Sequence, residues 1–175
     1  WELVEPEDYP SEAAWQPLYD LYQHSGDVNY YKNNFYMDNV RDYHLFVLAY
    51  QILDNGNKNE FVAIQNSTKV GEDKARMIFC PWDLGTSLGG SFDGQNLSGN
   101  YQNQSVGNQR INTNYPFSAM LKDSEYFNDM KARWKDVRTN VMSRKNLEDK
   151  MTAYAAEFIN SGAWKRESVV FGNTS

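Results

Sequence analysis

The order of apolar and polar residues predicts a mainly α-helical chain with one small β-hairpin. Apolar residues three or four positions apart, the spacing that places them on one side of a helix, recur near the N-terminus, in the middle and over the last third of the chain. Residues that favour N-caps begin most of these segments, and glycine ends the first and the last. The expected helices cover residues 11–26, 38–54, 116–121, 123–137 and 143–162, with Ser11, Asp38 or Asn39, Asp123 or Ser124, and Ser143 as caps.

Two short apolar segments predict the β structure. Residues 60–65 and 75–80 are rich in β-branched and aromatic residues, and a polar segment that contains Gly71 separates them. The sequence Asn55-Gly56-Asn57 before the first segment is typical of a turn. The pattern therefore predicts an antiparallel hairpin that directly follows the central apolar helix.

Two polar segments interrupt this pattern. Residues 27–37 alternate Asn with Tyr and Phe, which predicts a packed loop or a short helical turn rather than a strand. Residues 86–114 are rich in Gly, Asn, Ser and Gln and contain few apolar anchors. Because long segments without periodicity are usually functional loops, insertions or disordered stretches, we expect residues 86–114 to be a mobile loop.

Composition narrows the possible functions. The chain has 175 residues, of which 41% are hydrophobic, enough for residues 1–175 to form one folded domain. Its net charge is −6, which disfavours a nucleic-acid surface. No apolar run reaches the roughly 18 residues that a membrane span requires. The N-terminus lacks the pattern of a signal peptide and is expected to be the interior of a longer chain.

Candidate chemistry lies on both sides of the predicted hairpin. Asn59 follows Asp54 by five positions, which is the Asp-x-x-x-x-Asn interval of a protein-kinase catalytic loop, and Asp83 begins an Asp-Leu-Gly segment after the second strand. Hairpin pairing brings the start of one strand near the end of the other, so we expect these three residues to converge. Carboxylate and amide oxygens are suitable ligands for magnesium.

The chain resembles the spore coat protein H (CotH) kinase-like family over nearly its whole length. The first resembling features are an apolar helix that runs to Asp54, then Asn59, a hairpin, the Pro81-Trp82-Asp83 block, and Gly89. The closing section is similar through Pro116-Phe117, Leu121-Lys122-Asp123, Phe127, Trp134, Val137, Ser143 and Leu147.

This resemblance implies the C-terminal lobe of an atypical protein-kinase-like fold. It also implies transfer of phosphate from ATP, with magnesium, to a hydroxyl group of a protein substrate, in a spore-coat, cell-envelope or secreted setting. Asp54 matches the catalytic Asp and Asp83 the metal-binding Asp, while the kinase-like interval makes Asn59 a second magnesium ligand. Lys58 is either a contact for an ATP phosphate or a polar loop tip.

The sequence departs from the family pattern at three points. Gly85 stands where the family often has a second acidic residue, and no His-Arg pair precedes Asp54. The strand-rich N-terminal lobe, with its phosphate-binding lysine, is expected before Trp1. Because phosphoryl transfer depends on positioning the nucleotide, we expect the 175 residues alone not to phosphorylate.

Two other functions are compatible with the sequence. One is a catalytically silent cell-surface or adhesion protein that binds glycans or proteins through its Tyr- and Asn-rich loops. The other is a structural domain with no small-molecule ligand. Magnesium-dependent binding of ATP that requires Asp83 distinguishes the kinase-like protein from both.

Overall fold

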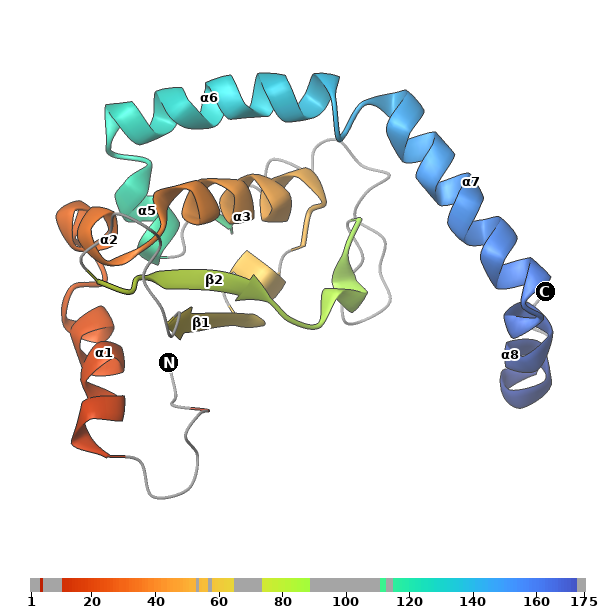
Figure 1. Ribbon diagram of the computed structural model, residues 1–175, viewed down its shortest axis with the longest axis horizontal. Coiled ribbons are helices and arrows are strands. Elements are labelled where there is room, and N and C mark those ends of the chain that lie inside the picture. The colour runs from red at the N-terminus through yellow and green to blue at the C-terminus, as the bar shows by residue number, and fades with distance from the viewer. Residues whose placement is uncertain are drawn as a thin grey trace. The chain divides into compact units, whose positions relative to one another are not determined.

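A computed structural model describes residues 4, 11–52, 54–56, 58–64, 74–88, 111–112 and 115–172. These residues form seven α-helices, two short 3₁₀-helices and one two-stranded antiparallel sheet (Figure 1). The chain divides into two compact units, Trp1–Met130 and Lys131–Ser175, and each is described by itself. The elements are α1 (Glu12–Gln23), α2 (Val28–Asn34), α3 (Met37–Ala49), η1 (Asp54–Gly56), β1 (Glu60–Ile64), β2 (Met77–Pro81), η2 (Leu84–Thr86), α5 (Tyr115–Met120), α6 (Ser124–Thr139), α7 (Arg144–Asn160) and α8 (Ala163–Phe171).

The first two helices begin at side-chain caps. The Ser11 hydroxyl accepts a hydrogen bond from the Ala14 amide, as the sequence predicts for α1. Asp27 caps α2 by accepting from the amides of Asn29 and Tyr30. The segment 27–37 is therefore mostly a two-turn helix, which agrees with the predicted short helical structure.

Helix α3 differs from the prediction at both ends. It begins at Met37 with Tyr36 at the N-cap and no side-chain cap, so the expected capping role of Asp38 or Asn39 is wrong. The Asn39 side chain instead bonds the backbone N–H and C=O of Phe79, at 2.7 and 3.1 Å. Bonding in this way attaches α3 directly to β2.

The expectation that α3 runs to Asp54 is also wrong, because the helix ends at Ala49. The amide of Ile52 donates to the carbonyl of Val47, and that of Gln51 donates to Leu48. This pair of bonds is a Schellman motif, in which the residue after the C-cap takes a left-handed conformation. Gln51 has φ of +51° and occupies the position where glycine is usual.

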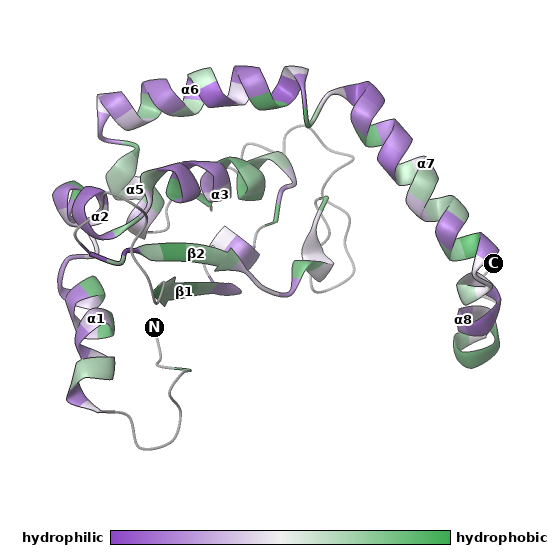
Figure 2. Ribbon diagram, in the orientation of Figure 1, coloured by the Kyte–Doolittle hydropathy of each residue, from purple (hydrophilic) through white to green (hydrophobic). Residues whose placement is uncertain are grey.

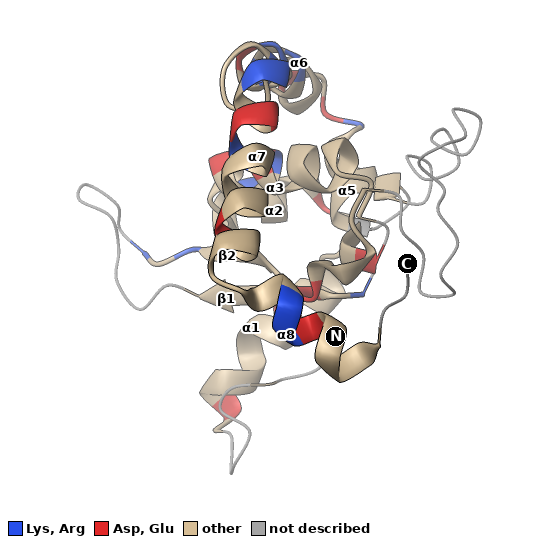
Figure 3. Ribbon diagram, turned by 90° about the vertical axis from the view of Figure 1, so that its right-hand side faces the viewer, with Lys and Arg blue, Asp and Glu red and all other residues tan. Residues whose placement is uncertain are grey.

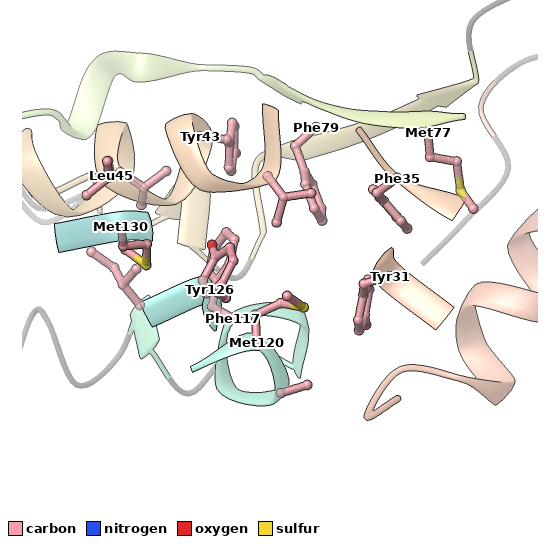
Figure 4. Close-up of a cluster of buried hydrophobic side chains, with 14 of the residues drawn as sticks. Tyr31, Phe35, Tyr43, Leu45, Met77, Phe79, Phe117, Met120, Tyr126 and Met130 are labelled. Atoms are coloured by element: carbon pink, nitrogen blue, oxygen red, sulfur yellow. The ribbon is translucent and has the colours of Figure 1, made fainter. Parts of the chain in front are cut away.

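The hairpin is confirmed, with ends that differ by one or two residues from the prediction. Strands β1 and β2 pair antiparallel, with Glu60 opposite Pro81 and Ile64 opposite Met77. Figure 2 colours most of both strands as hydrophobic. In the core, Phe79 stacks on Phe35 and Tyr43 at centroid distances of 5.2 and 5.4 Å (Figure 4). The aromatic side chains thus join β2 to the end of α2 and to α3.

Helices α5 and α6 complete the core of the first unit. Asp123 caps α6 by accepting from the Tyr126 amide, which confirms one of the two predicted caps. Phe117 of α5 packs parallel to the ring of His44 at 4.1 Å. The buried His44 ring bonds the Tyr126 hydroxyl through Nδ1 and the Asn112 carbonyl oxygen through Nε2. The Asn112 acceptor is its side-chain Oδ1 atom, so Nε2 donates to it, and burial lowers the pKa of the His44 ring, which is therefore neutral at pH 7.

The second unit consists of the later part of α6 together with α7 and α8. Ser143 caps α7 and Gly162, at φ of +73°, separates α7 from α8, as predicted. The ring of Trp164 packs edge-to-face against the ring of Phe158. Figure 3 shows both basic and acidic residues on α6. The apolar residues of α7 at helical spacing are nevertheless largely exposed within the described structure: Met151, Tyr154 and Phe158.

Of the predicted mobile loop 86–114, residues 89–110, 113 and 114 lie outside the described residues. Thr86 belongs to η2, and Ile111 is fully buried. The predicted mainly α-helical class with a small β-hairpin is confirmed. Among the described residues, no helix has the length and apolar character needed to cross a membrane.

The buried His44 predicts a stability that falls in acid. Burial lowers the pKa of His44 from its ordinary value of 6.5 to about 4, while its hydrogen bond to Asn112 acts in the opposite direction. The unfolded chain therefore binds a proton on this ring at a higher pH than the folded chain. The neutral buried ring therefore contributes about 3 kcal/mol to the free energy of unfolding. This contribution is complete above pH 6.5 and is lost as the pH falls toward 4.

Urea unfolding of the wild type and of His44→Gln across this pH range measures the effect. Gln retains one donor and one acceptor but does not titrate. As the pH falls from 6.5 to about 4, we expect the free energy of unfolding to decrease by about 3 kcal/mol more in the wild type than in the variant. Equal losses in both proteins would show that other groups dominate the acid response.

Candidate functional site

The segment from Asp54 to Asn59 forms a closed loop between α3 and β1. The carbonyl of Asp54 accepts hydrogen bonds from the amides of Lys58 and Asn59, at 2.7 and 2.9 Å. Its first three residues form η1, in which the Asp54 side chain is half-buried while Asn55 and Gly56 are buried. The two ends of the Asp-x-x-x-x-Asn interval are thus held together by the backbone.

The side-chain amide of Asn55 joins this loop to the end of β2. Its Nδ2 group donates to the carbonyl of Asn59 at 2.5 Å and to the carbonyl of Trp82 at 2.6 Å. The Trp82 amide also donates to the Asn59 carbonyl, at 3.2 Å. These three bonds place Asp83, the next residue, directly beyond the point where the two segments meet.

The Asn55 backbone is fixed from the opposite side by α3. The Tyr43 hydroxyl donates to the Asn55 carbonyl at 3.0 Å. Both side chains are buried, and burial raises the pKa of Tyr43, so this hydroxyl keeps its proton and acts as a donor. The loop is therefore attached to the core as well as to β2.

A close backbone approach explains Gly56. A Cβ atom at this position would lie 3.0 Å from Cγ1 and 3.1 Å from Cα of Ile111. A larger residue would therefore require Ile111, whose side chain is fully buried, to shift by a few tenths of an ångström. Glycine allows residues 111–112 to pack against η1.

Asp83 has an unusual backbone conformation. It is exposed and has φ of +49° and ψ of 74°, in the left-handed region, which Asp adopts more readily than most residues. The next helical turn, η2, follows at once, and the Leu88 amide then bonds the Tyr50 carbonyl at the end of α3. The turn that carries Asp83 is thus fixed before it, at Trp82, and after it, at Leu88.

The structure brings the four predicted site residues into two adjoining segments. Asp54, Lys58 and Asn59 belong to the closed loop, and Asp83 follows Trp82, the residue directly after β2 that the loop bonds. The Lys58 side chain is exposed and Asn59 is half-buried. The predicted convergence of these segments is therefore found in the backbone, whereas the roles assigned to the four side chains stay predictions.

The donor chemistry at this site fits a magnesium ion. Among the described residues there is no group of three or more His, Cys, Asp or Glu arranged to hold a metal. Magnesium commonly uses only one or two carboxylates and completes its shell with water and phosphate oxygens. Asp54, Asp83 and Asn59 offer oxygen ligands of these types from the two adjoining segments.

Asn55 is the residue that the sequence interpretation missed. The sequence Asn55-Gly56-Asn57 predicts a turn, and this pattern favours turns whether or not the asparagine is buried. In the structure it is completely buried and its amide joins the two segments of the site. Its position inside the Asp54 to Asn59 interval was the only available signal.

Comparison with known proteins gives one family match. A family model described as CotH kinase protein matches residues 7–173, nearly the whole chain. Neither the curated proteins nor the solved structures gave a match.

The left-handed backbone of Asp83 predicts that two substitutions differ in stability. A side chain in this conformation costs roughly 1–2 kcal/mol, whereas glycine adopts it freely. We expect Asp83→Gly to be more stable than Asp83→Ala by about 1 kcal/mol, after allowance for the larger entropy of the unfolded glycine chain.

Urea unfolding in metal-free buffer measures this difference. Both substitutions remove the same carboxylate, so repulsion between Asp83 and neighbouring acids cancels in the comparison. We also expect Asp83→Gly to exceed the wild type slightly if Asp83 and Asp54 repel each other. An Asp83→Ala protein as stable as Asp83→Gly would mean that this backbone carries no strain.

Proposed function

The chain belongs to the CotH kinase protein family, and from this premise we propose that it supplies the catalytic and magnesium-binding residues of a domain that transfers phosphate from ATP to a protein hydroxyl. In this proposal Asp54 is the catalytic residue, and Asn59 and Asp83 are magnesium ligands. Lys58 contacts a phosphate group of ATP. A spore-coat, cell-envelope or secreted setting belongs to the same proposal and rests on the family alone.

The observation that carries this proposal is the bond pattern between the loop and β2. Asn55 and Trp82 both donate to the Asn59 carbonyl, and Asn55 also donates to Trp82. A catalytic residue and its metal ligands have to keep a fixed separation, because displacements of about 1 Å reduce catalysis strongly. Hydrogen bonds from a buried side chain provide that rigidity.

Each residue has a chemical task in the proposed reaction. ATP with magnesium supplies the transferable phosphoryl group when bound. The half-buried Asp54 carboxylate would accept a hydrogen bond from the substrate hydroxyl and take its proton, while the hydroxyl oxygen bonds the γ-phosphorus of ATP and the bond from that phosphorus to ADP breaks, so that ADP leaves. Asn59 and Asp83 contribute hard oxygen ligands from two segments with a fixed separation. Lys58, exposed on the loop, has a cation free to extend toward phosphate oxygens.

The alternative of a silent surface protein has less support from the described residues. It depends on the Tyr- and Asn-rich segment as a glycan- or protein-binding loop. In the structure this segment forms α2 and places Tyr31 and Phe35 entirely in the core. Packing, rather than recognition, accounts for these two aromatic residues.

Calorimetric titration with magnesium and ATP tests the proposal. We expect the full-length protein to bind ATP only when magnesium is present, and Asp83→Asn to weaken this binding at least tenfold, or about 1.4 kcal/mol. Asn tolerates the left-handed backbone, so this variant removes charge without adding strain. Asp129→Asn, an exposed carboxylate on α6, is the matched control and should bind normally.

Absence of magnesium-dependent ATP binding in the wild type would refute the proposed function. Equal weakening in Asp83→Asn and Asp129→Asn would remove Asp83 from the site. Phosphoryl transfer by the 175 residues alone stays a separate prediction, for which we expect no activity.

The site also predicts a gain of metal affinity from Gly85→Asp. Among the described residues, a Cβ at Gly85 meets only the Oδ1 atom of Asp83 within 4 Å, at 3.4 Å, which is ordinary contact. A second carboxylate fits there and would lie beside the first. We expect it to increase magnesium affinity by about tenfold and to lower the stability of the metal-free protein through repulsion of like charges.

Magnesium titration of Gly85→Asp and Gly26→Asp measures this gain. Gly26 has open space around its Cβ position, so the control adds the same charge to the same unit away from the site. An equal gain in both variants would indicate a general effect of charge. No gain in Gly85→Asp would indicate that Asp83 does not bind the metal.

A further inference from the structure

Asn55 has a bonding arrangement that fixes its orientation. Its Nδ2 group faces two carbonyl oxygens, those of Asn59 and Trp82, and an amide NH₂ has two hydrogens to donate. Turning the amide over would place its own oxygen against both carbonyls. The observed orientation is therefore the one that the surroundings allow.

The remaining polar atom of Asn55 is buried. Its Oδ1 atom has no hydrogen-bond partner among the described residues, and the residue is 0% exposed. Burying a polar oxygen in this way costs free energy that a purely structural side chain would avoid. An apolar side chain would avoid this cost but would lose the two donated bonds, so the contribution of Asn55 lies in those bonds to Asn59 and Trp82.

The two bonded carbonyls adjoin the proposed ligand positions. Asn59 is itself one of the proposed magnesium ligands, and Trp82 immediately precedes the other, Asp83. The Tyr43 hydroxyl fixes the Asn55 backbone to α3 at the same time. Asn55 thus holds the loop and the Trp82 to Asp83 turn at one separation, from inside the core.

We propose that Asn55 is the positioning residue that sets the distance between the loop of Asn59 and the turn of Asp83. It touches neither substrate nor metal and acts only through the carbonyls that it bonds. Its importance for magnesium and ATP rests on the proposed function, whereas its control of the two segments does not. The two parts are tested separately.

Hydrogen exchange at the Trp82 amide tests the positioning role in the full chain without any ligand. This amide bonds the Asn59 carbonyl across the junction. Asn55→Asp keeps the size of the side chain but replaces the donors with a carboxylate that repels both carbonyls. We expect Trp82 exchange to accelerate more than tenfold, relative to the Tyr36 amide, which bonds Met77 at the other end of β2.

Asn39→Asp is the matched control. Asn39 also joins two segments through its side chain, by bonding the backbone of Phe79, but it lies away from the junction. We expect this variant to lower the melting temperature while leaving the ratio of Trp82 to Tyr36 exchange unchanged. The same change in that ratio for both variants, or no change for Asn55→Asp, would overturn the proposal.

Magnesium and ATP titration of the same proteins separates the proposal from the proposed function. If the function is correct, Asn55→Asp weakens binding at least tenfold at a temperature where it is folded, and Asn39→Asp does not. A wild type that binds no magnesium and ATP refutes the proposed function, while the exchange ratio still decides the role of Asn55. Normal binding by a folded Asn55→Asp would show that the ligand residues do not depend on it.

Discussion

The attachment of Phe79 to α3 is the interaction on which the rest of the first unit depends. The Asn39 side chain bonds both backbone groups of Phe79, and the Phe79 ring stacks on Phe35 and Tyr43. Polar and aromatic contacts therefore fix the same residue of β2 on the same helix. Within the described sheet β1 pairs with β2, so this attachment, together with the bond from the Tyr36 amide to the Met77 carbonyl, fixes one side of the hairpin on the helices.

The candidate site lies at the end of that fixed hairpin, and backbone strain gathers around it. Among the described residues, three that are not glycine have positive φ angles: Gln51, Asp83 and Leu88. Gln51 lies at the end of α3, before the loop, and Asp83 and Leu88 lie on either side of η2. Such conformations cost about 1–3 kcal/mol each and occur often at functional sites. Hydrogen bonds from Ile52 and Leu88 to α3 stabilise two of these three places.

The sequence predicted the order and type of elements better than their ends. The hairpin and the later helices follow directly from apolar spacing and caps. The apolar pattern continues through Ile52 and therefore predicts a helix that runs to Asp54. The Schellman motif ends α3 at Ala49 instead, and it has Gln51 at the position where glycine is usual, so the sequence does not signal it. Its start was misplaced because Asn39 bonds a strand that is forty residues away in the sequence, and local patterns contain no such information.

Burial was harder to predict than helix formation for the same reason. Periodicity identified α1 and α7, but Trp15, Tyr19 and Tyr154 are exposed within the described structure. Amphipathic spacing indicates that one side of a helix is apolar, but it does not indicate which part of the protein covers that side. Asn55 illustrates the reverse case, in which a residue typical of turns is completely buried by its tertiary contacts.

The positions at which the chain departs after Leu88 and returns at Ile111 have a consequence for sequence change in this protein. Leu88 is bonded to the end of α3, and Ile111 packs against Gly56 in the loop that follows it, so both points are attached to neighbouring parts of the chain. A substitution that breaks either attachment is therefore expected to disturb the turn that carries Asp83 or the loop that begins at Asp54, although neither Leu88 nor Ile111 is itself a candidate site residue.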